Sequence, residues 1–124
     1  MDLVLWIVAG LLAAVFLATG LLKLTRTKAQ LAASGLGWTE DFGAGTIKAI
    51  GATEVLAALG LILPAVTGIA PVLVPLAAIG LVLVMAGAIV VHARRHETPL
   101  LVANAVLLVL AAFVAWGRLG PYAF

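Results

Sequence analysis

The interpretation of the whole chain depends on one stretch: Lys48-Ala-Ile-Gly-Ala-Thr-Glu54-Val-Leu-Ala-Ala-Leu-Gly-Leu-Ile-Leu-Pro64. It is hydrophobic over most of its length, yet it carries a lysine at its start and a glutamate six residues further in. At a helical rise of about 1.5 Å per residue, Glu54 lies roughly 9 Å along the axis from Lys48. An ionised carboxylate at that depth of a bilayer is costly unless another group pairs with it, so it marks a candidate functional site. The rest of the chain must therefore show whether this segment is embedded and what faces Glu54.

The composition is that of an integral membrane protein. Of the 124 residues, 65% are hydrophobic and 10% are charged, and the mean hydropathy is +1.30. Ordinary soluble domains have about 45–50% apolar and about 25% charged residues, so this chain could not cover a soluble surface. The net charge of +2 is too small and too scattered for a nucleic-acid-binding surface. The sequence has no cysteine, which excludes disulfides and thiol chemistry.

Four apolar runs are each long enough to cross about 30 Å of hydrocarbon, which takes roughly 17–25 helical residues. They predict a single domain, residues 1–124, folded as an all-α bundle of four transmembrane helices. The spans are expected at about 3–23, 46–63, 72–92 and 100–118. Pro64 should end the second span, because proline cannot donate the backbone hydrogen bond that would continue the helix.

The first linker is the longest polar stretch and has structural signals of its own. Its Leu31-Ala-Ala33 predicts a short interfacial or re-entrant helix, which Ser34-Gly35 should break. Trp38 is typical of the aromatic belt at a membrane interface. Just before this linker, Thr19-Gly20 offers a place where another backbone can come close to the first span.

Positive charge predicts the orientation. The first and third linkers lie on the same side of a four-span protein and hold Arg26, Lys28, Arg94 and Arg95, whereas the other side holds Arg118 alone. Cytoplasmic loops carry the excess of Lys and Arg in membrane proteins. We therefore predict that both linkers are cytoplasmic and that both termini lie outside.

Glu54 needs a partner from another helix. Six residues separate it from Lys48, so the two side chains point about 240° apart around a helix and do not meet. The small residues Gly51 and Ala58 share the face of Glu54 and point it towards the bundle interior. Arg118 lies at the opposite end of the bundle. We therefore predict a ligand-binding polar cluster at one mouth of the bundle, made of Lys23, Lys48, Glu54, His92 and Asn104.

This cluster has two interpretations. In one, it binds the head group of a ligand or relays a proton. In the other, it is a structural hydrogen bond or ion pair that fixes helix register, a contact worth about 0.6 kcal/mol on average in membranes. The sequence favours neither.

The turn before the fourth span is basic. His92 and His96 are four residues apart and could share a helical face as metal ligands do, but Arg94 and Arg95 lie between them and disfavour a divalent cation. We predict no metal site, and expect Arg94, Arg95 and His96, with Trp38, to contact interfacial lipid or a partner protein. The sequence also has no nucleotide-binding glycine pattern and no nucleophile set, which disfavours an enzyme acting alone.

Short motifs occur in a fixed order along the four spans. They are Thr19-Gly-Leu-Leu-Lys23, Gly51-Ala-Thr-Glu54, Leu59-Gly-Leu-Ile-Leu-Pro64, Met85-Ala-Gly-Ala88 followed by His92, then Asn104 and Arg118. In their order and spacing the chain resembles the DoxX-like family of small bacterial four-helix membrane proteins, over nearly its whole length. The resemblance implies residence in the bacterial inner membrane as a multi-pass protein.

The resemblance implies a fold more than an activity. Some relatives are associated with redox systems, as a subunit of a thiosulfate–quinone oxidoreductase or as partners of a superoxide dismutase and a sulfurtransferase. We therefore expect a non-catalytic accessory subunit of a membrane redox or stress-response system, with membrane or cytoplasmic redox proteins or a second copy of itself as partner. The alternative is a binder of a small apolar ligand with a polar head, a quinone or a lipid, in a bundle cavity lined by Glu54. No cofactor is evident from the residues, and a quinone is the one candidate.

Overall fold

Four long helices carry the fold. The computed structural model describes residues 1–33, 37–120 and 122–123, and the regular structure within these ranges is entirely helical. The long helices are α1 (Asp2–Thr25), α3 (Ala44–Thr67), α4 (Leu73–Arg94) and α5 (Thr98–Leu119). Each is long and apolar enough to cross a membrane. The predicted four-helix membrane bundle is therefore confirmed.

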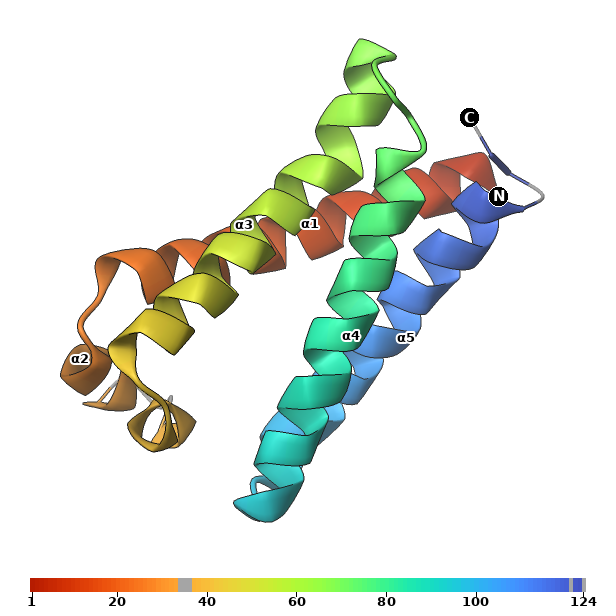
Figure 1. Cartoon of the computed structure of the whole chain (residues 1–124). Helices are drawn as coiled ribbons and strands as arrows, with labels where there is room; N and C mark the ends of the chain where they lie inside the picture. Colours follow the sequence, from red (N-terminus) through yellow and green to blue (C-terminus); the bar gives the residue numbers. More distant parts are fainter. Residues whose placement is uncertain (34–36, 121, 124) are drawn as a thin grey trace.

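The long helices are arranged as two pairs (Figure 1). Helix α1 packs along α3 and α4 packs along α5, whereas contacts between the pairs are fewer. The N- and C-termini and the α3–α4 loop lie at one end of the molecule, which we call the terminal end. The α1–α3 linker and the α4–α5 turn lie at the other, the linker end, and the two pairs diverge towards it.

The core lies where the two pairs meet. Buried side chains from all four long helices contribute to it, among them Phe16, Leu61, Leu81 and Val114. Large apolar side chains also cover the outside of the bundle, as at Leu56, which is 69% exposed. In a bilayer this outer surface meets lipid, so tight packing and polar contacts hold the helices together rather than the removal of apolar surface from water.

Helices α1 and α3 approach each other closely at a pair of glycines. A Cβ atom placed on Gly20 would lie 2.7 Å from the carbonyl oxygen of Gly51, and one on Gly51 would lie 2.8 Å from the carbonyl oxygen of Gly20. No larger residue fits there without moving a backbone, which confirms the close approach expected at Thr19-Gly20. Glu54 follows Gly51 by three residues on the same face of α3, so this contact turns Glu54 towards α1.

The first linker contains two short helices. Helix α2 (Lys28–Ala33) is the short helix that the sequence predicted, and the break expected directly after it falls on residues 34–36, outside the described residues. A 3-10 helix, η1 (Gly37–Asp41), follows and carries Trp38.

The end of the second span differs from our expectation. Helix α3 does not end at Pro64 but continues to Thr67. Pro64 falls in the last turn, where its missing N–H removes a single hydrogen bond, and the Thr67 hydroxyl donates to the Leu63 carbonyl at 2.7 Å. The helix ends where Gly68 takes a left-handed conformation with φ of 72°, a common helix C-terminus for glycine.

Candidate functional site

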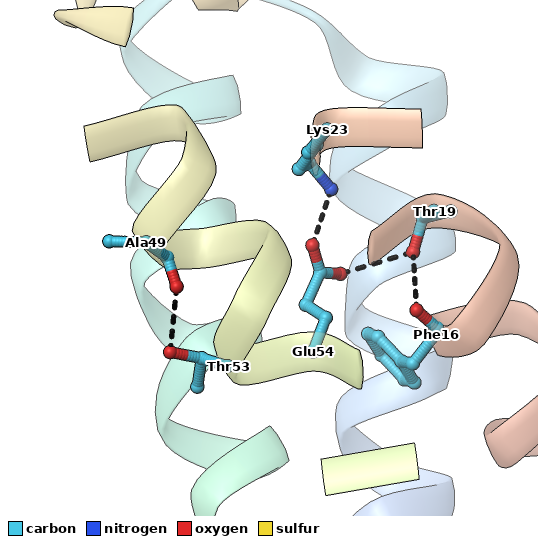
Figure 2. A network of polar contacts seen from close by, with 6 residues as sticks. All are labelled: Phe16, Thr19, Lys23, Ala49, Thr53 and Glu54. Atoms are coloured by element: carbon cyan, nitrogen blue, oxygen red, sulfur yellow. Dashed lines mark hydrogen bonds and ion pairs between the residues drawn. The ribbon is translucent and has the colours of Figure 1, made fainter. Parts of the chain in front are cut away.

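An ion pair joins α1 to α3 near the linker end (Figure 2). Lys23 Nζ lies 2.5 Å from Glu54 Oε1, and the Thr19 hydroxyl donates to Glu54 Oε2 at 3.1 Å. Thr19 and Lys23 are four residues apart and so share one face of α1. The neighbouring Thr53 takes no part, because its hydroxyl donates to the Ala49 carbonyl of its own helix.

This ion pair is buried. Glu54 is 2% exposed and Lys23 is 8% exposed. Two charges can be removed from water together only if they pair well and their remaining lone pairs are satisfied. The contact from Thr19 meets the second requirement for Glu54, since both carboxylate oxygens then accept a hydrogen bond.

A cavity of about 440 Å³, which we call the central cavity, lies beside the ion pair. Its wall contains residues from both helix pairs and from the end of the first linker. Most of these are apolar, including Phe16, Ile50, Leu83, Met85, Val91 and Leu107. A volume of this size and a mostly apolar wall are typical of small-molecule sites, which measure about 300–1,000 Å³.

A few polar side chains interrupt the apolar wall: Thr19, Lys23, Glu54, His92 and Asn104. His92 Nδ1 lies 3.0 Å from Glu97 Oε1, and an ionised carboxylate accepts only, so Nδ1 carries the proton of that bond and Nε2 keeps its bonding capacity. Asn104 Nδ2 donates to the Leu100 carbonyl at 2.9 Å, which leaves its side-chain oxygen and second N–H. Lys23 likewise has more donors than its one bond to Glu54 uses.

Trp38 brings the polar wall residues together from η1. Lys23 Nζ lies 5.7 Å from the centroid of its ring, within the range of a cation–π contact. The ring also stands edge-on to His92, with 6.4 Å between centroids, and edge-on to Phe42 at 5.8 Å. Trp38 therefore lines the central cavity beside two of its polar residues. The contact of Trp38 with interfacial lipid or a partner protein stays a prediction.

The structure brings four of the five predicted cluster residues to one wall. Lys23, Glu54, His92 and Asn104 all line the central cavity, whereas Lys48 does not. Lys48 is exposed, and its Nζ donates to the Leu24 carbonyl at 3.0 Å. The six-residue spacing explains this separation, because it points Lys48 and Glu54 to different sides of α3. That the four residues contact a ligand stays a prediction.

The basic turn between α4 and α5 is only partly free. Arg94 and His96 are exposed, but Arg95 Nε lies 3.3 Å from Glu97 Oε1, the same oxygen that bonds to His92. Contact of Arg94, Arg95 and His96 with lipid or with a partner protein stays a prediction.

Two contacts at the candidate site were missed from the sequence. Thr19 was noted only beside a close-packing glycine, although its position four residues before Lys23 places both on one helical face. Glu97 was not considered, and its bond to His92 depends on how the chain turns between α4 and α5. No helical periodicity signals a contact across such a turn.

Comparison with known proteins identifies the family. A model of the DoxX-like family matches residues 7–114, which is most of the chain. No curated protein and no solved structure matched the chain. The chain therefore belongs to the DoxX-like family and is a multi-pass membrane protein.

Proposed function

We propose that this DoxX-like membrane protein binds a small molecule with an apolar body and a polar head in the central cavity. The observation that supports the proposal is the cavity of about 440 Å³, mostly apolar, beside the buried Lys23–Glu54 pair. Sites that bind small molecules combine such a wall with a few polar groups that fix orientation.

The wall chemistry favours a neutral polar head. Lys23 and Glu54 cancel each other's charge, so an ionic head would leave a net charge in a mostly apolar cavity, at high cost. The groups with spare capacity are a lysine N–H, the Asn104 amide and His92 Nε2. A carbonyl head, as in a quinone, accepts from the lysine and amide N–H groups. A hydroxyl head, as in a neutral lipid, can in addition donate to His92 Nε2 or to the Asn104 side-chain oxygen.

The other interpretation is an accessory subunit of a membrane redox or stress-response system that acts through protein contacts. In this interpretation Arg94, Arg95 and the first linker contact the partner protein, and the central cavity has no role in function. The two interpretations therefore differ in what happens when the cavity is filled or its polar wall is removed.

The test is mass spectrometry of organic extracts from protein purified out of bacterial membranes. Two variants address the cavity. Gly87→Leu fills it, because Gly87 lines the cavity and has nothing within 4 Å of its Cβ position. Lys23→Met/Glu54→Gln removes the ion pair from the polar wall without leaving one buried charge alone. We expect a small molecule that co-purifies with the wild type and is at least about tenfold depleted in both variants, a loss of about 1.4 kcal/mol in affinity.

Gly80→Leu is the matched control. Gly80 is also in α4 and has open space at its Cβ position, but it does not line the central cavity. It should retain the molecule at the wild-type level. Identical extracts from the wild type, Gly87→Leu and the double variant would contradict ligand binding and leave the accessory role.

We also propose that the linker end faces the cytoplasm of a bacterial inner membrane. The linker end holds Arg26, Lys28 and Arg94, while Arg118 lies at the terminal end, so the charge bias supports this orientation. The chain has no cysteine and gives no thiol background. In intact spheroplasts, a membrane-impermeant maleimide should label Thr67→Cys, whereas Ala29→Cys should react only after permeabilisation. The reverse pattern would invert the proposed topology.

A further inference from the structure

A second cavity, of about 250 Å³, lies where the end of α1 meets the starts of α2 and α3. We call it the basic cavity, because four cationic residues line it: Lys23, Arg26, Lys28 and Lys48. None of the described residues in its wall is acidic. It lies at the ends of two membrane-spanning helices, which is where the head groups of a bilayer meet a protein.

Two of the four cations already have partners. Lys23 pairs with Glu54, and Lys48 Nζ donates to the Leu24 carbonyl in the last turn of α1. Within the described part of the chain, the side chains of Arg26 and Lys28 make no hydrogen bond or ion pair. The basic cavity therefore holds two cations that have no ion-pair partner among the described residues.

Helix capping explains only part of this arrangement. Cations near a helix C-terminus interact favourably with its dipole, and Lys23 and Lys48 serve that purpose for α1. Capping needs neither a hollow nor further cations beyond the helix end. Thr27 adds a hydroxyl to the wall that accepts from the Gln30 N–H and keeps its own proton to donate.

We propose that the basic cavity binds the phosphate of an anionic phospholipid. Basic pockets between membrane helices bind anionic head groups. Arg26 and Lys28, together with the Thr27 hydroxyl proton, supply the donors that a phosphate requires. The acyl chains would then lie along the apolar outer surface of α1 and α3. This proposal is independent of ligand binding in the central cavity.

Native mass spectrometry of the full chain released from nanodiscs of phosphatidylcholine and phosphatidylglycerol tests it. We expect the wild type to retain one phosphatidylglycerol in preference to phosphatidylcholine. Arg26→Gln should lower the ratio of lipid-bound to lipid-free protein about fivefold, and Arg26→Gln/Lys28→Gln about 30-fold, from the worth of each cation near an anionic head group. Inorganic phosphate, added to the released wild type, shows which part of the lipid is recognised. If it displaces the bound phosphatidylglycerol, the phosphate group alone is recognised; if the phosphatidylglycerol stays bound, the whole lipid is recognised. Both results support the proposal.

Two controls keep the test specific. Arg94→Gln removes the same charge from the same end of the molecule, but Arg94 lines neither cavity. Its contact with interfacial lipid, predicted above, lies outside the basic cavity, so the ratio should fall by well under the fivefold loss expected for Arg26→Gln. Gly87→Leu should also leave the ratio unchanged, so the two proposals stand or fail separately. Equal losses in Arg26→Gln and Arg94→Gln, or equal retention of the two phospholipids, would overturn the proposal.

Discussion

The two ends of the bundle each bury a cation against a carboxylate, yet they differ in what lies beside it. Near the linker end, Lys23 pairs with Glu54 and both line the central cavity. At the terminal end, Arg118 pairs with Asp2 at 2.5 Å, donates to the Tyr122 carbonyl at 2.9 Å and lies 5.8 Å from the centroid of the Trp6 ring. Arg118 is 5% exposed and lines neither cavity.

The difference shows that a buried cation paired with a carboxylate does not by itself mark a binding site. Arg118 is surrounded by protein and bonds to Asp2 at the start of α1 and to Tyr122 after the end of α5. These contacts account for its burial without a ligand. The Lys23–Glu54 pair also fastens two helices, but beside it lies a space that no side chain fills. That space distinguishes a candidate site from a structural contact.

The largest expected effect comes from breaking the pair near the linker end. Glu54→Gln leaves Lys23 buried without a counter-charge and should destabilise the protein by about 3–5 kcal/mol. In Lys23→Met/Glu54→Gln the lone charge is absent, so most of that loss should be recovered. Reversible unfolding in detergent, followed by circular dichroism, measures both. Equal losses in the single and double variants would show that an unpaired charge is not the cause.

Asp2→Asn is the matched change at the terminal end. The Asp2 side chain is 65% exposed, so the pair is open to solvent on one side, and Arg118 keeps its contacts with Tyr122 and Trp6. The free energy of unfolding should fall by less than about 1 kcal/mol. A loss of stability as large as that of Glu54→Gln would show that the ion pairs at the two ends are equally important for stability.

An intermediate effect is expected where α1 and α3 cross. Gly20→Ala would bring a methyl group to 2.7 Å from the Gly51 carbonyl oxygen, and backbone atoms on both helices would have to move. The expected cost is about 1–3 kcal/mol in the same unfolding assay. Gly10→Ala, in open space on the same helix, should be neutral or stabilise by up to about 1 kcal/mol. A harmless Gly20→Ala would mean that the ion pair does not depend on this close contact.

Much of the fold could be predicted because its signals are local. The four spans follow from runs of apolar residues. Helical geometry also predicted that Lys48 and Glu54 do not meet, although we still placed Lys48 in the cluster with Glu54. The exception was Pro64, where the rule that proline stops a helix overlooked how little one lost hydrogen bond costs in a last turn. The left-handed Gly68, four residues later, ends α3 instead.

The site was less predictable because it depends on how helices face each other. Lys23 was one of several candidate partners for Glu54, and the register that brings the two together is set by the contact of Gly20 with Gly51. The central cavity lies between the two helix pairs, which diverge towards the linker end. No pattern of residues in the sequence predicts the angle between helix pairs. Trp38 is in the first linker, and it lines the cavity because the linker packs against the long helices. This long-range contact could not be predicted from the sequence either.

Ligand binding in the central cavity can be tested by a crystal structure of the protein purified from bacterial membranes. We expect density for one non-protein molecule in the central cavity, with a polar atom within hydrogen-bonding distance of Lys23 Nζ or Asn104 and with its apolar part along α4. We expect no such density beside Arg118 and Asp2. A central cavity closed by side chains, or filled only with ordered water, would rule out the proposed binding site.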